Sequence, residues 1–238
     1  VLFGCGGGKG GPQDAPVDVT DVAIADVPGG GLFDVSDEIP ASRLHGLVDL
    51  NGDTRADLVT SAPGGATIEV RIGNAARTGD VVPTAFDKSF ESKLVDVDAD
   101  GMLDLIVTDS VFDKLHVLRG TGGGSFDTAA PKTTTLAIGI GTYVVGPFDG
   151  NAGNDLLVAN ESATTVSLYR GNGDGTFVTT PATLEVGVKP LDLYVADLDA
   201  DGDQDLVVTS RSPEAIAIFL GAGNGTFTQS MRFDDPQM

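Results

Sequence analysis

The 238-residue chain contains no tryptophan, one cysteine, two histidines and only 14 lysine and arginine residues. A single cysteine excludes an intramolecular disulfide framework, and so few cysteines and histidines cannot form a Cys/His zinc site. The shortage of basic residues argues against nucleic-acid binding, which requires a basic surface. No apolar run approaches the length that spans a membrane as a helix.

Acidic residues and glycines are abundant instead. The 35 aspartates and glutamates give a formal net charge of −21, and hydrophobic residues still make up 41% of the chain, which is enough for a core. The 33 glycines are typical of a fold with many short strands and tight turns. An acidic surface stays soluble but repels itself, and bound cations would relieve that repulsion.

The most informative stretch is residues 195–210, where carboxylates alternate with other residues in a short loop between two apolar segments. Its candidate oxygen ligands are Asp197, Asp199, Asp201 and Asp205 at positions one, three, five and nine, with the carbonyl of Asp203 at position seven. Gly202 permits the sharp turn. Crowded carboxylates favour a hard cation, and Ca²⁺ accepts about six to eight oxygen ligands in flexible loops. The loop therefore predicts a calcium site.

Three related loops precede this one, and the first positions of the four loops are 47, 51 and 50 residues apart. Their candidate ligands are Asp49, Asn51, Asp53 and Asp57 in the first, Asp96, Asp98, Asp100, Asp104 and the carbonyl of Met102 in the second, and Asp149, Asn151 and Asp155 in the third. Pro147 and Asn151 leave the third loop with fewer charges, and fewer charges mean weaker binding. We therefore expect three calcium sites and a degenerate fourth. In the first loop, Thr54 stands at the turn position of Gly202, so we expect backbone strain there.

A glycine-rich motif that ends in phenylalanine keeps the same period, at residues 120–126, 171–177 and 221–227. Alternation between the motifs predicts four short strands in the last repeat, at 191–196, 206–210, 215–220 and about 227–233, and inner strands in the third repeat at 142–146, 156–159 and 166–169. A four-stranded unit repeated about every 50 residues is typical of propeller blades. We expect an all-β propeller with about four blades within residues 31–238.

The pattern Asp-x-Asp/Asn-x-Asp-Gly-x-x-Asp-Leu, followed by Gly-Asn-Gly-Asp-Gly-Thr-Phe, resembles FG-GAP repeats of the VCBS type, which also form the calcium-carrying blades of integrin α-subunits. The resemblance covers about residues 31–238. It implies that each ion lies between the first and second strands of a blade, and that the ring usually has seven blades. Residues 31–40 resemble the outer strand of a preceding blade. The resemblance therefore implies a part of a larger ring, with a four-bladed ring or completion by a partner chain as alternatives.

Competing motifs fit less well. An EF-hand requires an acid at the twelfth position, where this chain has Thr60, Val107 and Val208. The glycine-rich motifs lack the Lys-Ser/Thr that follows a phosphate-binding loop. We expect their phenylalanines to pack between blades; they are Phe126, Phe177 and Phe227.

Catalytic motifs are also missing from the sequence. His45 and His116 lie in predicted strands without a nucleophile at a recognisable spacing, and the Gly-x-Ser-x-Gly and His-Glu-x-x-His patterns do not occur. Aspartates are numerous enough for a glycosidase pair, but calcium binding already explains them. We therefore predict that the chain is not an enzyme.

The amino-terminal segment predicts export from a bacterial cell. Leu2, Gly4 and Cys5 match a lipobox, which makes residues 1–4 the end of a signal peptide and Cys5 the lipidated residue; the alternative is a free thiol in a flexible end. Residues 5–30 are rich in glycine, proline and aspartate, so we expect a disordered tether. The predicted location is a membrane-anchored lipoprotein, or otherwise the periplasm or the extracellular space.

Together these features predict an exported, calcium-binding propeller that acts as a non-enzymatic binding, adhesion or scaffold module. We expect a protein or glycan ligand on the face opposite the calcium loops, formed by the turns near 61–66, 109–114, 160–164 and 210–215. We expect no nucleic-acid partner, and membrane contact only through the lipid anchor. The alternatives are a carbohydrate-binding lectin, for which aromatic platforms are scarce, and an accessory domain of a secreted hydrolase.

Overall fold

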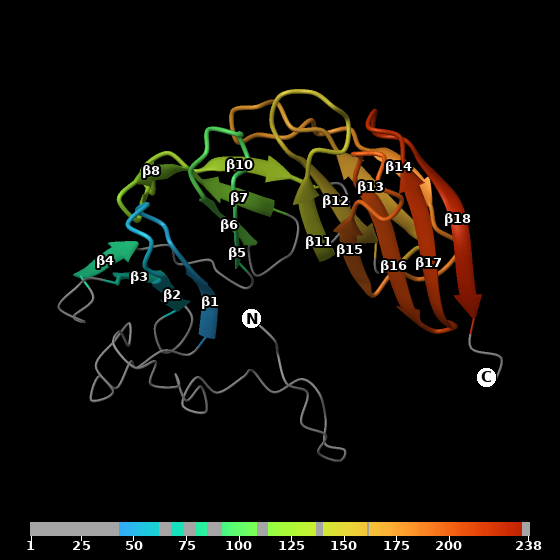
Figure 1. Cartoon of the computed structure of the whole chain (residues 1–238), viewed down its shortest axis with the longest axis horizontal. Helices are drawn as coiled ribbons and strands as arrows, with labels where there is room; N and C mark the ends of the chain where they lie inside the picture. Colours follow the sequence, from blue (N-terminus) through green and yellow to red (C-terminus); the bar gives the residue numbers. More distant parts are fainter. Residues whose placement is uncertain are drawn as a thin grey trace, which may run out of the picture.

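The computed structural model describes residues 43–61, 68–73, 80–84, 92–108, 114–136, 140–160 and 162–234. Over these residues the chain forms four antiparallel sheets of four strands and one short hairpin (Figure 1). No helix long and apolar enough to cross a membrane occurs in this described part. The lipobox with Cys5, the tether and the strand expected at 31–40 lie outside the described residues.

Each sheet is one blade. Blade one contains β1 (Arg43–Val48), β2 (Asp57–Ser61), β3 (Ile68–Ile72) and β4 (Asp80–Thr84); blade two contains β5 (Ser92–Val95), β6 (Asp104–Thr108), β7 (Lys114–Leu118) and β10 (Lys132–Thr135). Blade three contains β11 (Ile140–Gly146), β12 (Asp155–Asn160), β13 (Thr165–Tyr169) and β14 (Ala182–Glu185); blade four contains β15 (Asp192–Ala196), β16 (Asp205–Arg211), β17 (Glu214–Gly221) and β18 (Phe227–Asp234). The hairpin pairs β8 (Gly120–Gly122) with β9 (Ser125–Phe126). The predicted strands of the third and fourth repeats are confirmed to within two residues at each end.

The blades follow one another around an open arc that does not close into a ring within the described residues (Figure 1). The first strands of neighbouring blades lie side by side, β1 beside β5 and β11 beside β15. Between β1 and β5, the His45 Nδ1 lies 2.5 Å from Ser92 Oγ. On β7, the His116 Nδ1 lies 2.9 Å from Thr133 Oγ1 of β10. Both histidines therefore make contacts that join neighbouring strands.

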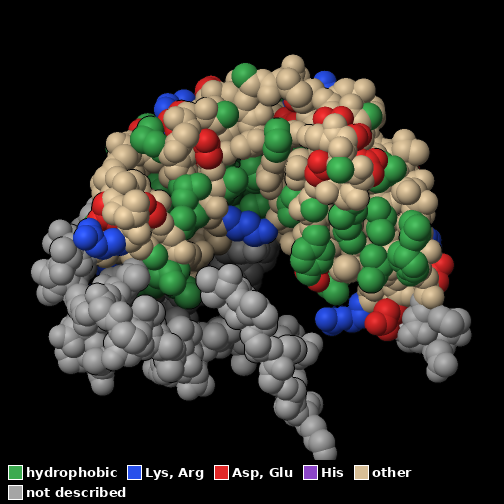
Figure 2. All heavy atoms as spheres, in the orientation of Figure 1, with side chains coloured by type: hydrophobic (Ala, Val, Ile, Leu, Met, Phe, Trp, Pro, Cys, Tyr) green, Lys and Arg blue, Asp and Glu red, His purple; other side chains and the backbone are tan. Residues whose placement is uncertain are grey.

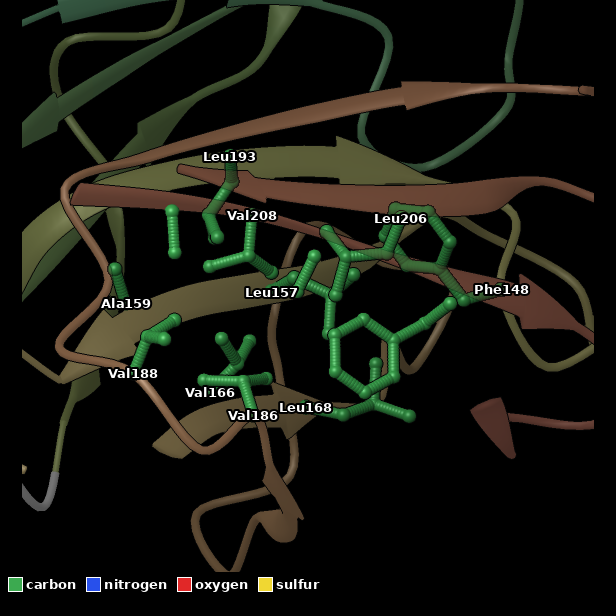
Figure 3. Packing of buried hydrophobic residues seen from close by; sticks show 13 residues of the cluster. Phe148, Leu157, Ala159, Val166, Leu168, Val186, Val188, Leu193, Leu206 and Val208 are labelled. Carbon is green, nitrogen blue, oxygen red and sulfur yellow. The ribbon is translucent and has the colours of Figure 1, made fainter. Parts of the chain in front are cut away.

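Three apolar cores fill the spaces between consecutive blades. The core between blades three and four combines β12 and β13 side chains, such as Leu157 and Val166, with β16 side chains, such as Leu206 and Val208 (Figure 3). Phe219 of β17 belongs to the same core. Strand β12 is covered on both faces, which explains why its sequence is an almost unbroken apolar run. The blade is the repeating unit, and the contact between two blades is the repeating source of stability.

The phenylalanines of the glycine-rich motifs occupy these cores, as predicted. Phe126 belongs to the core between blades one and two, and Phe177 to the core between blades two and three. Phe227 packs against the core between blades three and four, where its ring meets that of Phe148 edge to face at a centroid distance of 6.0 Å. Each motif therefore anchors its own blade to the preceding one.

Blade four has one uncovered face. Cross-strand pairing places Tyr194, Val207, Ile218 and Met231 in one row of that face and Thr209, Ile216 and Phe233 in the next. The side chains of Tyr194, Ile216, Met231 and Phe233 are 56%, 44%, 49% and 53% exposed. Figure 2 shows hydrophobic side chains gathered over this sheet. The matching face of blade three, which includes Leu157 and Leu168, is buried against blade four.

Candidate metal centres

The four acidic loops connect the first and second strands of the four blades, as the sequence predicts. We number them loop one (49–57), loop two (96–104), loop three (147–155) and loop four (197–205). They lie at the same end of the blades as the glycine-rich turns. The amide of Gly225 donates to the Phe148 carbonyl (2.7 Å), and the amide of Asn154 donates to the Val97 carbonyl (2.9 Å). Adjacent blades are therefore joined along this edge.

In loops one, two and four a carboxylate at position one organises the loop, whereas loop three has Pro147 there. In loop one, Asp49 accepts hydrogen bonds from four successive backbone amides, from Asn51 to Thr54, at 2.7 to 3.2 Å. Removal of water alone would raise the pKa of Asp49, but the four amides together lower it. Asp96 and Asp197 each accept two amides in the same way. In these three loops the backbone thus wraps around the position-one carboxylate.

This wrapping places loop residues in the left-handed region. Thr54 has a φ of 69°, which confirms the strain expected at that position. Two alanines at position four, Ala99 and Ala200, have φ values of 61° and 65°. These alanines were not predicted to be strained, because nothing distinguishes them in the sequence from ordinary loop residues. Loop three differs, since its left-handed residues are Gly150 and Gly153.

Two loops gather three carboxylates. Oxygens of Asp96, Asp98 and Asp104 lie within 4.8 Å of one another in loop two, and those of Asp197, Asp199 and Asp201 do so in loop four. Loops one and three bring no three acidic groups together in this way, although both belong to the described part of the chain. The complete aspartate sets of loops two and four therefore form the candidate centres.

Burial, followed by the charges of neighbouring carboxylates, raises the pKa of one carboxyl in each of these two loops. Burial is the main cause for Asp104, with smaller contributions from the charges of Asp98 and Asp100. Loss of water also raises the pKa of Asp199, and the neighbouring carboxylates of loop four add to it. In the metal-free chain these negative charges thus oppose one another, and a bound cation would remove that cost.

A buried oxygen in loop two tests whether a cation fits. The side chain of Asp98 is only 4% exposed, and its Oδ2 lies 2.8 Å from Arg119 Nε. Its Oδ1 is buried and has no hydrogen-bond partner. An unsatisfied buried carboxylate oxygen is costly, and an oxygen-binding cation among Asp96, Asp98 and Asp104 would satisfy it. The all-oxygen donor set suits Ca²⁺ rather than a soft metal.

Residues 96–158, 148–208 and 197–237 each match the FG-GAP-like repeat. The chain belongs to the FG-GAP-like repeat family. Among solved structures, it resembles BBS1N, crystallised with ARL6DN and soaked with lead (16% identity, TM-score 0.51, covering 84% of this chain and 57% of that one). It also resembles a candidate 6-phosphogluconolactonase from Bacteroides fragilis NCTC 9343 (17% identity, TM-score 0.56, covering 81% and 55%). The chain thus spans little more than half of each, and at these identities only the fold is shared. No curated protein sequence matches it significantly.

The four blades share one feature that sequence reasoning missed, at position nine. There the aspartate accepts the backbone amide of position two through one oxygen, and through the other the amide of a glycine at the end of the third strand, at 2.7 to 3.1 Å. The four aspartates and their glycines are Asp57 with Gly73, Asp104 with Gly120, Asp155 with Gly171, and Asp205 with Gly221. All four carboxylates are buried.

We call this pair of residues the Asp–Gly clasp. It joins the acidic loop to the start of the glycine-rich motif 16 residues later. The glycine is required, because a Cβ at Gly171 or Gly221 would overlap the carbonyl oxygen at position eight of the loop. The available signal was that position nine and this glycine are the same in all four repeats, whereas positions one, three and five vary.

Proposed function

We propose that this chain is an exported FG-GAP propeller module whose blades are stabilised by calcium and which serves as a scaffold for binding, not as an enzyme. The observation that carries the proposal is the buried, unpartnered oxygen of Asp98 within a cluster of three carboxylates. Such an oxygen is expected where a cation belongs, because burial without a partner is otherwise destabilising.

Two centres would hold the ion. In loop two the ligands are Asp96, Asp98 and Asp104 with the carbonyl of Met102; in loop four they are Asp197, Asp199 and Asp201 with the carbonyl of Asp203. The ion supplies positive charge that ties the loop between the first two strands of the blade. The residues themselves hold the loop closed through the position-one amide bonds and the Asp–Gly clasp.

Calcium removal tests this proposal. We expect EDTA to lower the melting temperature of the chain by several degrees and excess Ca²⁺ to restore it, because ligand binding to the native state alone stabilises that state. A double substitution of Asp98→Asn and Asp199→Asn should make the melt much less sensitive to EDTA. Asp192→Asn, outside the loops, is the matched control and should respond like the wild type. A wild-type melt that is identical in EDTA and in Ca²⁺ would contradict the proposal.

The exported location is supported by the lipobox-like Leu2, Gly4 and Cys5 and by the FG-GAP repeats, which are typical of extracellular or exported proteins. Calcium modules outside cells bind with dissociation constants of about 10⁻⁴ to 10⁻³ M. Exposed loops of this charge suit that range. The lipid on Cys5 would tether the module to a membrane surface.

We place the ligand, a protein or a glycan, on the face opposite the acidic loops. In the described residues this face includes the turn at 211–214, whose four residues are all exposed; the turns at 62–67 and 109–113 lie outside the described residues. A ligand that binds here should protect the amides of Arg211, Ser212 and Glu214 from hydrogen exchange. Protection confined to loops two and four would place the ligand on the wrong face and overturn this assignment.

A further inference from the structure

Two arginines occupy equivalent positions in blades two and three. Arg119 and Arg170 each follow the third strand of their blade and precede the clasp glycine. Arg119 Nε lies 2.8 Å from Asp98 Oδ2, and its Nη2 lies 3.6 Å from Asp100 Oδ2. Arg170 Nε lies 3.4 Å from Asp149 Oδ2. Each guanidinium therefore faces the acidic loop of its own blade.

The corresponding residues of blades one and four are apolar, Ile72 and Leu220. Loop one has a different cation, Arg55, whose Nη1 lies 3.3 Å from Asp53 Oδ2. Within the described residues, no ion pair joins loop four to a lysine or an arginine. Loop four is thus the one acidic loop of this part of the chain that has no internal counter-charge.

The formal charges of the loops consequently differ. Loop four has five aspartates and no arginine, for a charge of −5, and loop two has four aspartates and Arg119, for −3. Loop one has three aspartates and Arg55, for −2, and loop three has two aspartates and Arg170, for −1. Calcium affinity in such loops follows the ligand charge.

The loop-three arginine does more than reduce charge. The side chain of Asp149 is 2% exposed, so its pairing with Arg170 is screened little by water. The Nη2 of Arg170 also reaches the carbonyl of Asn224 in the glycine-rich turn of blade four, at 3.5 Å. The guanidinium thus links the loop to the next blade. In loop two, by contrast, Arg119 satisfies only Oδ2 of Asp98 and leaves Oδ1 without a partner.

We infer that Arg119 and Arg170 are internal counter-cations, and that they divide the loops by their dependence on calcium. Arg170 takes the place of the ion in loop three, Arg119 competes with the ion in loop two, and loop four depends on an external cation alone. The part that concerns calcium rests on the calcium binding proposed above. The resulting order of affinity is loop four first, then loop two, with loop three without calcium.

Calcium titration by calorimetry tests the competition in loop two. The background is a chain with Asp199→Asn and Asp201→Asn, which should remove the tightest class of sites. Adding Arg119→Gln to this background should tighten the remaining binding by about tenfold, because a unit charge a few ångströms from a divalent ion is removed. Arg119→Lys, which keeps the charge, should bind like the background. Arg211→Gln, an exposed arginine remote from the acidic loops, controls for the change in net charge and should also leave affinity unchanged.

Melting in EDTA tests the same arginines without calcium. Arg170→Gln should lower the melting temperature by a few degrees, since it leaves the buried Asp149 without a counter-charge and with only the hydrogen bonds from Asn151, whereas Arg211→Gln should change it by less than about one degree. If the wild-type chain binds no calcium, the proposed function fails. The melting temperature of Arg170→Gln in EDTA still tests whether Arg170 acts as a counter-cation, because that measurement needs no calcium. If wild-type chain binds calcium but Arg119→Gln matches Arg211→Gln, or Arg119→Lys tightens binding as much as Arg119→Gln, the inference is overturned and the calcium proposal stands.

Discussion

Replacing Asp205 with asparagine is expected to lower the free energy of unfolding by about 3 kcal/mol, measured by urea denaturation in EDTA. The carboxylate is fully buried and accepts the amides of Leu198 (2.7 Å) and Gly221 (2.9 Å), one on each oxygen. Asparagine replaces one of these oxygens with an NH₂ group that faces an N–H donor. The substitution therefore breaks one arm of the Asp–Gly clasp and weakens the other.

Asp199→Asn is the matched control, because it makes the same chemical change in the same loop and removes the same negative charge. Asp199 accepts the amide of Asp201 through one oxygen, and in loop one Asn51 makes the equivalent bond to the amide of Asp53. We expect a change below about 1 kcal/mol at this exposed site. Equal losses for Asp205→Asn and Asp199→Asn would show that the clasp contributes nothing beyond loop charge.

Replacing Gly171 with alanine is expected to cost about 2–3 kcal/mol, because overpacking against a backbone atom forces the chain to shift. A Cβ at this position would overlap the carbonyl oxygen of Asn154, and that oxygen belongs to the loop itself. The shift would also lengthen the hydrogen bond from the Gly171 amide to Asp155, now 2.8 Å. Chemical denaturation of the calcium-free chain measures the loss.

Gly101→Ala separates this overlap from a general intolerance of glycine replacement. Gly101 has a φ of 87°, but a Cβ there would meet no atom within 4 Å. Its cost should be about 1 kcal/mol, the strain of a left-handed alanine, and Ala99 and Ala200 already adopt such a conformation. A loss for Gly171→Ala no greater than for Gly101→Ala would contradict the role assigned to the clasp glycine.

The sequence predicted the elements of this fold because its signals are local and repeated. The alternation of apolar and polar residues, together with the turn residues between them, predicts β16 and β17 from only a few neighbouring residues. The spacing of the aspartate loops predicts the length of a blade. The packing of Phe177 was predictable because a large apolar residue after a tight turn has few places to go other than the core.

The features that the sequence did not predict depend on atoms brought together from different segments. Asp205 was predicted only as a calcium ligand, and its bond to the amide of Gly221, 16 residues later in the chain, was not predicted. Nothing in the sequence separates Arg119 from the other 13 basic residues, because its contact with loop two forms only when the third strand of its blade ends beside that loop. Ala200 is left-handed because its amide donates to Asp197 within the loop, and the identity of residue 200 as alanine does not predict that conformation.

The two ends of the arc differ in how favourably they could be covered by another surface, because the exposed face of blade four is apolar. A surface that covered Tyr194, Ile216 and Phe233 would remove their apolar area from water, which favours association by about 25 cal/mol per Å². The face of blade one turned away from blade two carries the Glu69–Arg71 ion pair at 3.6 Å, whose desolvation opposes covering. Between two molecules, the attraction of one apolar face for another is balanced mainly by the repulsion of a net charge of −21. Salt screens that repulsion beyond about 8 Å at physiological ionic strength, so a higher ionic strength weakens the repulsion that opposes contact between two such faces.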